Sequence, residues 1–332
     1  MKKNKRVTIY DLANELGISA SYVSRALNNH PGISEKMKQM VQLKAQALNY
    51  RHNTNAANLR KGASSTIGVI VPKINENFFS NAIAGIEEAC TEHQHHLIIC
   101  QSDESYEKEV AAVQKLINLN VDCIIISVSA ETSRFKHLEE IMHNNIQLVQ
   151  FDRTAEVINS CKVENDTRDA ARQAVLHLLA KGYKRIAYIG GPEQLPTFRD
   201  RKEGFLSAME AADIVVPWNY IVGNVLTKEK GIAVAMDLLQ LKNPPDAIVT
   251  VTDYVALGVL QAAGQLGITV PDQLGVFGFA NEIFAELISP GLSSVEQHAK
   301  VMGRRAADCY FEGKEAGTEV IKCEVLVRRT TK

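Results

Sequence analysis

Five small, polar or basic residues lie at helical spacing near the N-terminus and could contact DNA. They are Ala20, Ser21, Ser24, Arg25 and Asn28. Arginine donates bidentate hydrogen bonds to guanine in the major groove, and serine and asparagine bond to base edges and phosphates. The intervening positions Val23, Ala26 and Leu27 are apolar and predict a buried face. A short helix with one buried face and one polar, cationic face is typical of a helix-turn-helix.

Local signals place this helix after another helix and a tight turn. Thr8 and Asp11 have the spacing of a capping box, so a first helix is predicted to begin at residue 9. Its apolar positions are Ile9, Leu12, Ala13 and Leu16. Gly17 suits the left-handed backbone past a helix end, and Ser19 can cap the second helix. Taken alone, these signals fit an ordinary helical hairpin in a larger core equally well.

The distribution of charge favours DNA binding over the hairpin. Residues 1–62 hold eleven Lys and Arg and three Asp and Glu, a net charge of +8. The whole chain has 37 basic and 38 acidic residues, so the remainder carries −9. A basic head on an acidic body suits a phosphate polymer that binds at one end of the molecule.

The sequence resembles the lac-repressor (LacI/GalR-type) family of bacterial transcription regulators. The matching stretches are VTIYDLANELGISASYVSRALNNHPGIS, LNYRHNTNAANLRKG, TIGVIVP, FFSNAIAGIEEA, RIAYIGGP, RKEGF, DYVALGVL and LSSVEQ, which together span nearly the entire chain. The resemblance implies a repressor that binds a palindromic operator on double-stranded DNA as a homodimer, under the control of a small-molecule effector. The residues it places at the DNA are Thr8, Tyr10, Ala20, Ser21, Tyr22, Ser24, Arg25, Asn28, Asn53, Ala56 and Leu59.

Residues 50–62 are polar and rich in asparagine, and by composition they predict a linker. The resemblance implies that this segment is a hinge helix that orders on operator DNA, where Leu59 enters the minor groove and opens a base step. Isolated helices of this length are unstable in water, so ordering upon binding is physically reasonable. His52 and Tyr22 depart from the family pattern, so the operator sequence cannot be copied from relatives.

From residue 66 the pattern changes to alternating strands and helices. The strands are predicted at 66–71, 96–100, 122–127, 147–151, 185–190, 246–251 and 274–279. The helices between them are predicted at 79–92, 106–119, 168–181, 199–212, 228–241 and 254–266. Strict alternation of this kind predicts an α/β fold, with parallel sheets covered by helices on both faces.

Seven or more strands exceed one typical domain, so two lobes are expected. The resemblance implies a two-lobed, periplasmic-binding-protein-like domain with doubly wound parallel sheets, in which the chain crosses between lobes near 163–165, 289–292 and 320–322. The expected organisation is a three-helix helix-turn-helix head at 1–52 and a hinge helix with linker at 53–65. A ligand-binding and dimerisation domain is expected at 66–332.

In open parallel sheets, ligands bind beyond the carboxyl ends of the strands, which here means between the lobes. The candidate ligand-binding residues are Phe78, Phe79, Asp152, Thr197, Arg201, Asp253 and Asn281. The two phenylalanines could stack on a ligand ring or pack in the core. Arg201 could bind hydroxyl or carboxylate oxygens or form a surface salt bridge, and Asp253 could serve as a helix cap. Ala280 stands where the family commonly has an acidic residue, which weakens the resemblance to sugar-binding members.

Other function classes have less support. His93, His95 and His96 lack a matching Cys or His group, so no metal or cofactor is expected. No GxGxxG or phosphate-binding loop follows a strand and no GxSxG occurs, so the chain is not expected to be an enzyme. A solute-binding protein without a DNA role is the main alternative, and the basic head argues against it. No apolar run reaches the ~18–20 residues of a membrane span, and no signal core follows the basic N-terminus, so a cytoplasmic protein is expected.

Overall fold

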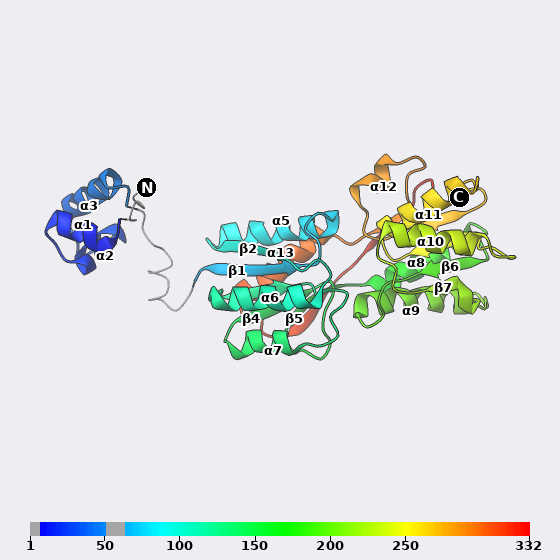
Figure 1. Ribbon diagram of the computed structural model, residues 1–332, viewed down its shortest axis with the longest axis horizontal. Coiled ribbons are helices and arrows are strands. Elements are labelled where there is room, and N and C mark those ends of the chain that lie inside the picture. Colours follow the sequence, from blue (N-terminus) through cyan, green and yellow to red (C-terminus); the bar gives the residue numbers. More distant parts are fainter. Residues whose placement is uncertain (1–6, 51–63) are drawn as a thin grey trace. The chain divides into compact units, whose positions relative to one another are not determined.

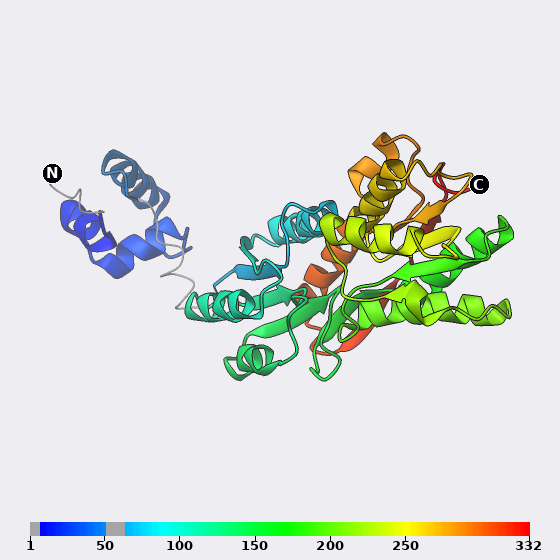
Figure 2. The same cartoon turned by 45° about the vertical axis from the view of Figure 1, so that its right-hand side comes forward.

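A computed structural model describes residues 7–50 and 64–332 of the chain. Its contacts divide the chain into two compact units, Met1–Ser64 and Ser65–Lys332. Figure 1 shows the small helical unit and the larger α/β unit, and Figure 2 shows the same ribbon from a second direction. Each unit is described by itself.

The first unit is a three-helix head made of α1 (Ile9–Leu16), α2 (Ala20–Leu27) and α3 (Glu35–Ala47). Thr8 and Asp11 form the predicted capping box, in which the Thr8 backbone N–H donates to Asp11 Oδ2 at 2.8 Å. Gly17 ends α1 in the left-handed region at φ 66°, and Ser19 Oγ accepts from the Tyr22 N–H at 3.2 Å. The buried core of the head is Leu12, Ala13, Val23, Ala26, Ile33, Val41 and Ala45. The predicted helix–turn–helix geometry is therefore confirmed.

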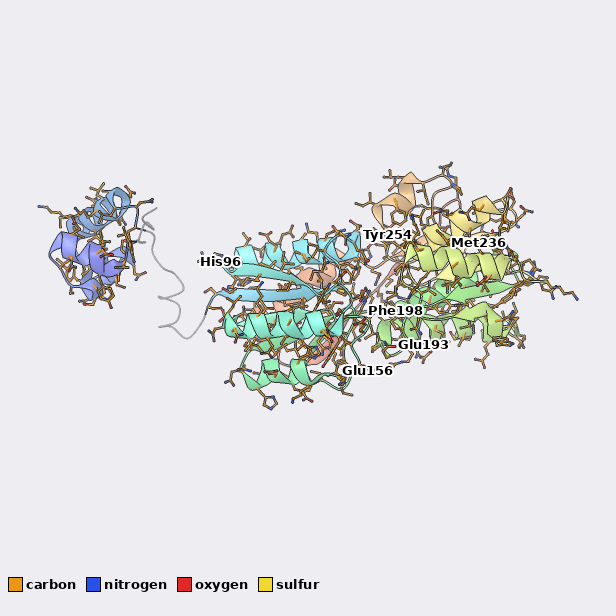
Figure 3. All side chains as sticks on the ribbon, in the orientation of Figure 1. His96, Glu156, Glu193, Phe198, Met236 and Tyr254 are labelled. Carbon is orange, nitrogen blue, oxygen red and sulfur yellow. The ribbon has the colours of Figure 1, made fainter. Side chains whose placement is uncertain are left out.

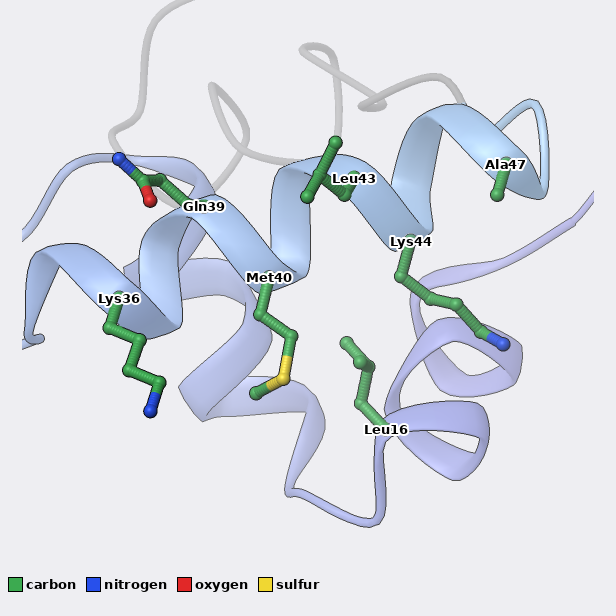
Figure 4. Close-up of a pocket in the computed structure, with 7 residues that line it drawn as sticks. All are labelled: Leu16, Lys36, Gln39, Met40, Leu43, Lys44 and Ala47. Carbon is green, nitrogen blue, oxygen red and sulfur yellow. The ribbon is translucent and has the colours of Figure 1, made fainter.

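Helix α3 carries apolar side chains outside this core. Met40 and Leu43 are 43% and 67% exposed. Figure 4 shows them with Leu16 of α1 in a shallow pocket on the surface of the head. Lys36 and Lys44 also line this pocket, so the exposed apolar strip is bordered by positive charge.

The first lobe of the larger unit is built on a six-stranded sheet in the order β11-β5-β4-β3-β1-β2, and every neighbouring pair is parallel. Its strands are β1 (Thr66–Val71), β2 (His96–Gln101), β3 (Cys123–Ile126), β4 (Gln147–Phe151), β5 (Cys161–Asn165) and β11 (Gly317–Ile321). Its helices are α5 (Asn77–Glu92), α6 (Tyr106–Asn118), α7 (Lys136–His143) and α13 (Ala299–Phe311). Ile67, Val69 and Val71 of β1 pack in the cluster with α5 and α13, whereas Ile70 packs in the cluster with α6. The strand is buried on both faces, as expected for a doubly wound sheet.

Two helices of this lobe cross at glycines. A Cβ on Gly85 of α5 would meet the Lys300 carbonyl, and one on Gly303 of α13 would meet the Ala82 carbonyl. The backbones of α5 and α13 can therefore approach only because these positions lack side chains.

The second lobe contains a parallel sheet in the order β7-β6-β8-β9. Its strands are β6 (Ile186–Ile189), β7 (Ile221–Val222), β8 (Ala247–Thr250) and β9 (Gly275–Phe277). Its helices are α8 (Thr167–Ala180), α9 (Pro196–Ala211), the 3-10 helix η1 (Trp218–Tyr220), α10 (Lys228–Leu239), α11 (Asp253–Gln265) and α12 (Ile283–Leu287). An antiparallel pair, β10 (Ser294–Glu296) and β12 (Glu324–Leu326), completes the lobe. Helices α8 and α9 pack together in one buried cluster, and α10 and α11 pack together in another.

The chain passes between the lobes after Asn165, after Glu296 and after Ile321. The second passage lies later than the predicted 289–292. The reason is that residues 291–295 still belong to the second lobe. Gly278 donates to the Ser293 carbonyl at 2.8 Å, Ala280 donates to the Val295 carbonyl at 3.0 Å, and Val295 is buried in that lobe's core.

The predicted strands and helices all occur, with ends shifted by up to three residues. The elements that the sequence patterns did not predict are β5, β7, β10, β11, β12, α7, α12, α13 and the 3-10 helix η1. Most are short or carry charged side chains between apolar ones, so their hydrophobic periodicity is weak. Among the described residues, no helix has the length and apolar character required to cross a bilayer.

Candidate functional site

Helix α2 presents its polar residues outward, as predicted. Ser21, Arg25 and Asn28 are exposed, Ala20, Tyr22 and Ser24 are half-buried, and Val23 and Ala26 are buried. The Arg25 guanidinium carbon lies 5.8 Å from the centre of the Tyr22 ring, within range of a cation–π contact. Asn28 Nδ2 donates to the Ser24 carbonyl at 2.9 Å, which closes the helix end. The exposed face therefore combines one cation with short polar side chains.

The remaining candidate DNA contacts fall into two groups. Thr8 and Tyr10 flank the start of α1, and Tyr10 is 68% exposed. The Thr8 hydroxyl is engaged in the cap, since it bonds to Asp11 Oδ2 at 2.7 Å. Asn53, Ala56 and Leu59 lie outside the described residues.

In the larger unit, a small cavity of about 40 Å³ lies between the two lobes. Its lining residues are Glu76, Phe78, Phe79, Asp152, Arg153, Phe198, Arg201, Thr252, Tyr254, Phe279, Ala280, Glu282 and Gln297. Most of them follow the carboxyl ends of β1, β4, β8 and β9, or lie in the first turns of α5, α9 and α11. Figure 3 labels Phe198 and Tyr254 at the junction of the lobes. A cavity of this volume has room for only a few water molecules, so a drug-sized or sugar-sized ligand requires the lobes or side chains to move.

Polar contacts hold the lobes together around this cavity. Asn77 of the first lobe donates its backbone N–H to Glu282 Oε2 of the second at 3.2 Å. Arg199 and Glu156 form an ion pair at 2.6 Å, and Gln194 Nε2 donates to the Ala130 carbonyl at 2.8 Å. Each contact joins a residue of one lobe to a residue of the other, so separating the lobes breaks all three.

Arg201 lines the cavity and is 4% exposed. Its guanidinium carbon stacks 3.8 Å from the centre of the Phe279 ring, and its Nη1 donates to the Val251 carbonyl at 2.6 Å. Its buried Nε has no hydrogen-bond partner among the described residues. Because an unpaired buried donor is costly, this N–H is suited to bind a ligand oxygen.

A second arginine, Arg153, faces the cavity from the first lobe. Its Nη1 donates to both carboxylate oxygens of Glu104 at 2.8 Å, and its Nε lies 3.8 Å from Asp152 Oδ2. Its guanidinium carbon is 5.1 Å from the centre of the Phe198 ring in the opposite lobe. Burial raises the pKa of Asp152, while Arg153 and Arg201 oppose that rise. The site therefore combines donors, acceptors and aromatic faces within one cavity.

Two more carboxyl groups line the cavity. Burial raises the pKa of Glu76 from its ordinary value of 4.5 to about 7; Glu104 and Glu282 add to the rise and Arg153 opposes it. Burial also raises the pKa of Glu282, although the backbone N–H groups of Asn77 and Phe78 lower it. Glu282 therefore caps the N-terminus of α5 from the opposite lobe, where the helix dipole favours negative charge.

Glu76 makes stability depend on pH. Its folded-state pKa of about 7 exceeds the ordinary value of 4.5. Its contribution to the free energy of unfolding is therefore complete below about pH 4.5 and is lost as pH rises through about 7. We expect Glu76→Gln to flatten the fall in melting temperature between about pH 4.5 and 7. Glu107→Gln, which changes an exposed acid, should retain the wild-type slope, and parallel curves for wild type and Glu76→Gln would exclude this role.

The structure brings four of the seven candidate ligand residues to the cavity: Phe78, Phe79, Asp152 and Arg201. The other three do not line it. Thr197 is buried beside Arg201, whose Nη2 donates to Thr197 Oγ1 at 3.4 Å. Asn281 is bonded to Glu296 and to Arg328 at 2.8 Å each, within the second lobe.

Asp253 is occupied by its own lobe. Its Oδ1 accepts from the Ser294 hydroxyl at 2.6 Å, and its Oδ2 accepts from the Glu282 N–H at 2.7 Å. Burial raises its pKa to about 7 despite these bonds. Asp253 begins α11 after the Thr252 cap, so its role here is to hold the loop that carries Glu282.

Several cavity residues were not predicted as ligand contacts. Glu76, Phe198, Tyr254, Phe279, Glu282 and Gln297 all line the cavity. Position near a strand end is a signal that could have found Phe279, which lies two residues after Phe277, the last residue of β9. The crossing residue Gln297 and the capping residue Glu282 have no such signal, because their placement depends on contacts between lobes.

The histidine cluster at 93–96 packs against aromatic rings. The His93 ring stacks on Phe311 at 3.8 Å, and His95 lies edge-on to Tyr310 and Phe311. In the described part of the chain, no group of three or more His, Cys, Asp or Glu side chains could hold a metal ion.

Comparisons with known proteins agree with this geometry. A family model described as bacterial regulatory proteins, lacI family, matches residues 8–53, and one described as a periplasmic binding protein-like domain matches residues 175–331. Catabolite control protein A of Priestia megaterium is 32% identical over 292 residues, covering 88% of this chain and 87% of the relative. The HTH-type transcriptional regulator DegA of Bacillus subtilis is 32% identical over 332 residues, covering 98% of each.

A solved structure has the same fold. It is a lac repressor dimer bound to operator and the anti-inducer ONPF, with a TM-score of 0.86 and 22% identity. The match covers 98% of this chain and 99% of that chain. At this identity the likeness establishes the arrangement of helices and sheets.

Proposed function

Because this chain belongs to the lacI family of bacterial regulatory proteins, we propose that it represses transcription by binding a palindromic operator as a homodimer. A small molecule in the interlobe cavity sets its affinity for DNA. The observation that carries the proposal is the pairing of two features in one chain. One is a capped helix-turn-helix head with Arg25 exposed on α2, and the other is a cavity lined by both lobes of a separate unit.

The cavity favours a neutral, hydroxylated ring, such as a sugar or sugar derivative, as the ligand. Arg201 offers an unpaired donor, Asp152 and Glu76 offer acceptors, and Phe79 and Phe198 offer apolar ring faces. Position 280 supplies no carboxylate, because Ala280 lines the cavity there. The positive charges of Arg153 and Arg201 nearly balance the negative charges of the acidic side chains that line the cavity. This near balance disfavours a strongly charged ligand.

Each segment of the chain has its own proposed role. Residues 1–52 bind DNA, residues 53–65 form the hinge segment, and residues 66–332 bind ligand and dimerise. A DNA-binding role puts the protein in the bacterial cytoplasm, where the DNA is. We propose no enzymatic activity, since the relatives are named as regulators.

Selection from a DNA library with a palindromic core tests the DNA-binding role, with and without candidate monosaccharides, disaccharides and nucleosides. We expect enrichment of a two-fold symmetric sequence and a shift in affinity with at least one compound class. A solute-binding protein without a DNA role would bind a compound but enrich no sequence. An α/β enzyme would instead consume one of the compounds.

The dimer is separately testable. One recognition helix reads only a few base pairs, and half-sites one helical turn apart require a two-fold protein. We expect sedimentation at micromolar concentration to show a dimer in the absence of DNA. A monomer both with and without DNA would contradict this prediction.

A further inference from the structure

All three passages between the lobes meet at one asparagine. Asn165 ends β5 at the first passage, and its Nδ2 donates to the Gln297 carbonyl of the second passage at 2.9 Å. The same Nδ2 donates to the Ile321 carbonyl of the third passage at 3.2 Å. Gln297 Nε2 returns a hydrogen bond to Asn165 Oδ1 at 3.0 Å. We call Asn165 and Gln297 the hinge amides.

These bonds lie where the backbone must turn when the lobes move. Lobe closure in two-lobed proteins is absorbed by a few residues at the passages between lobes. The three passages are separate strands of chain, so rotation changes their spacing unless they move together. The two donor bonds of Asn165 join the first passage to the other two, and the return bond from Gln297 closes a reciprocal amide pair. Rotation that separates the passages breaks several bonds at once.

Gln297 also reaches the ligand cavity. It is 2% exposed and is one of the residues that line the space between the lobes. A ligand oxygen or N–H that bonds to its carboxamide changes the geometry or strength of the bond to Asn165. Ligand binding and hinge geometry therefore share one side chain.

We propose that the hinge amides restrain rotation of the lobes away from the arrangement described above, and that a ligand weakens or strengthens this restraint through Gln297. The coupling of this restraint to DNA binding rests on the proposed function, whereas the restraint on lobe rotation does not. Asn165 and Gln297 are positioning residues for lobe movement. Buried amides resist rotation here because each lost bond leaves a polar group without a partner.

Isosteric variants test the restraint on lobe rotation, because they change the hydrogen bonds with little change in side-chain volume. Asn165→Asp removes both N–H donors and places a carboxylate beside two carbonyls. Gln297→Glu removes the donor to Asn165. Gln150→Glu is the matched control, because Gln150 is fully buried in β4 and bonds only within the first lobe, to Ser160 at 2.9 Å and to the Ala155 N–H at 2.7 Å.

Hydrogen exchange of the full chain, followed by mass spectrometry without any ligand, provides the readout. The Asn77 N–H bonds to Glu282 across the lobes, so segment 74–79 reports separation of the lobes. We expect this segment and segment 194–201 to exchange about 10-fold faster in both hinge variants. Strand β3 should exchange at the wild-type rate in all proteins, which shows that the fold is intact.

Two results would overturn the proposal that the hinge amides restrain lobe rotation. One is faster exchange confined to the neighbours of residues 165 and 297, with 74–79 unchanged. The other is equal acceleration at 74–79 in Gln150→Glu, which would indicate general loosening. Operator affinity is measured separately with the selected DNA, so a failure to bind DNA would reject the proposed function and leave the exchange result standing.

Discussion

Replacing Arg25 with alanine is expected to weaken binding to the selected operator by about 5- to 150-fold. Loss of one bidentate contact to a base costs about 1–3 kcal/mol and relaxes the preference at that base pair. Arg25 is exposed on α2 and is braced by the Tyr22 ring, so its removal leaves the buried core of the head untouched. Fluorescence anisotropy at fixed salt, with operator and with scrambled DNA, measures both affinities.

Lys36→Ala is the control for charge. Lys36 is exposed on α3 and lies outside the polar face of α2, and its loss removes the same single positive charge. It should weaken operator and scrambled DNA alike, because a phosphate contact carries no sequence information. If Arg25→Ala reduced both affinities by the same factor, Arg25 would be a phosphate contact and not a base reader.

The second large effect is expected at Arg201. Arg201→Lys retains the positive charge but loses the planar fork and its Nε donor. Hydrogen bonds to charged groups contribute about 1.5–3 kcal/mol, so an effector identified with the wild type should bind about 10- to 100-fold more weakly. The midpoint of its effect on operator affinity should shift by the same factor, whereas operator affinity without ligand should stay near wild type.

Arg201 also contributes to packing, so the variant needs structural controls. The guanidinium stacks on Phe279 and bonds to the Val251 carbonyl, and thermal unfolding will show how much stability these contacts supply. Lys202→Ala, on the same helix, removes a surface ion pair with Glu193 and should leave the ligand response unchanged. An unchanged midpoint in Arg201→Lys would remove Arg201 from the ligand site.

Sequence alone determined the parts of this protein that depend on short-range interactions. The capping box of Thr8 and Asp11, the left-handed Gly17 and the Ser19 cap all bond within three or four residues, so spacing suffices to predict them. Strand–helix alternation likewise predicted both sheets, because burial on two faces requires continuous apolar runs. The position of Arg201 in the cavity followed from the family resemblance combined with the chemistry of its side chain.

The tertiary structure alone decided which polar groups line the interlobe cavity and which hold the fold. Asp253 has the position of a ligand contact, yet Ser294 and the Glu282 N–H, which lie 41 and 29 residues away, occupy both its oxygens. Asn165 and Gln297 are 132 residues apart and meet only when three passages converge. A carboxylate or amide takes whichever partners the folded chain brings within about 3 Å, and periodicity carries no information about partners so distant in sequence.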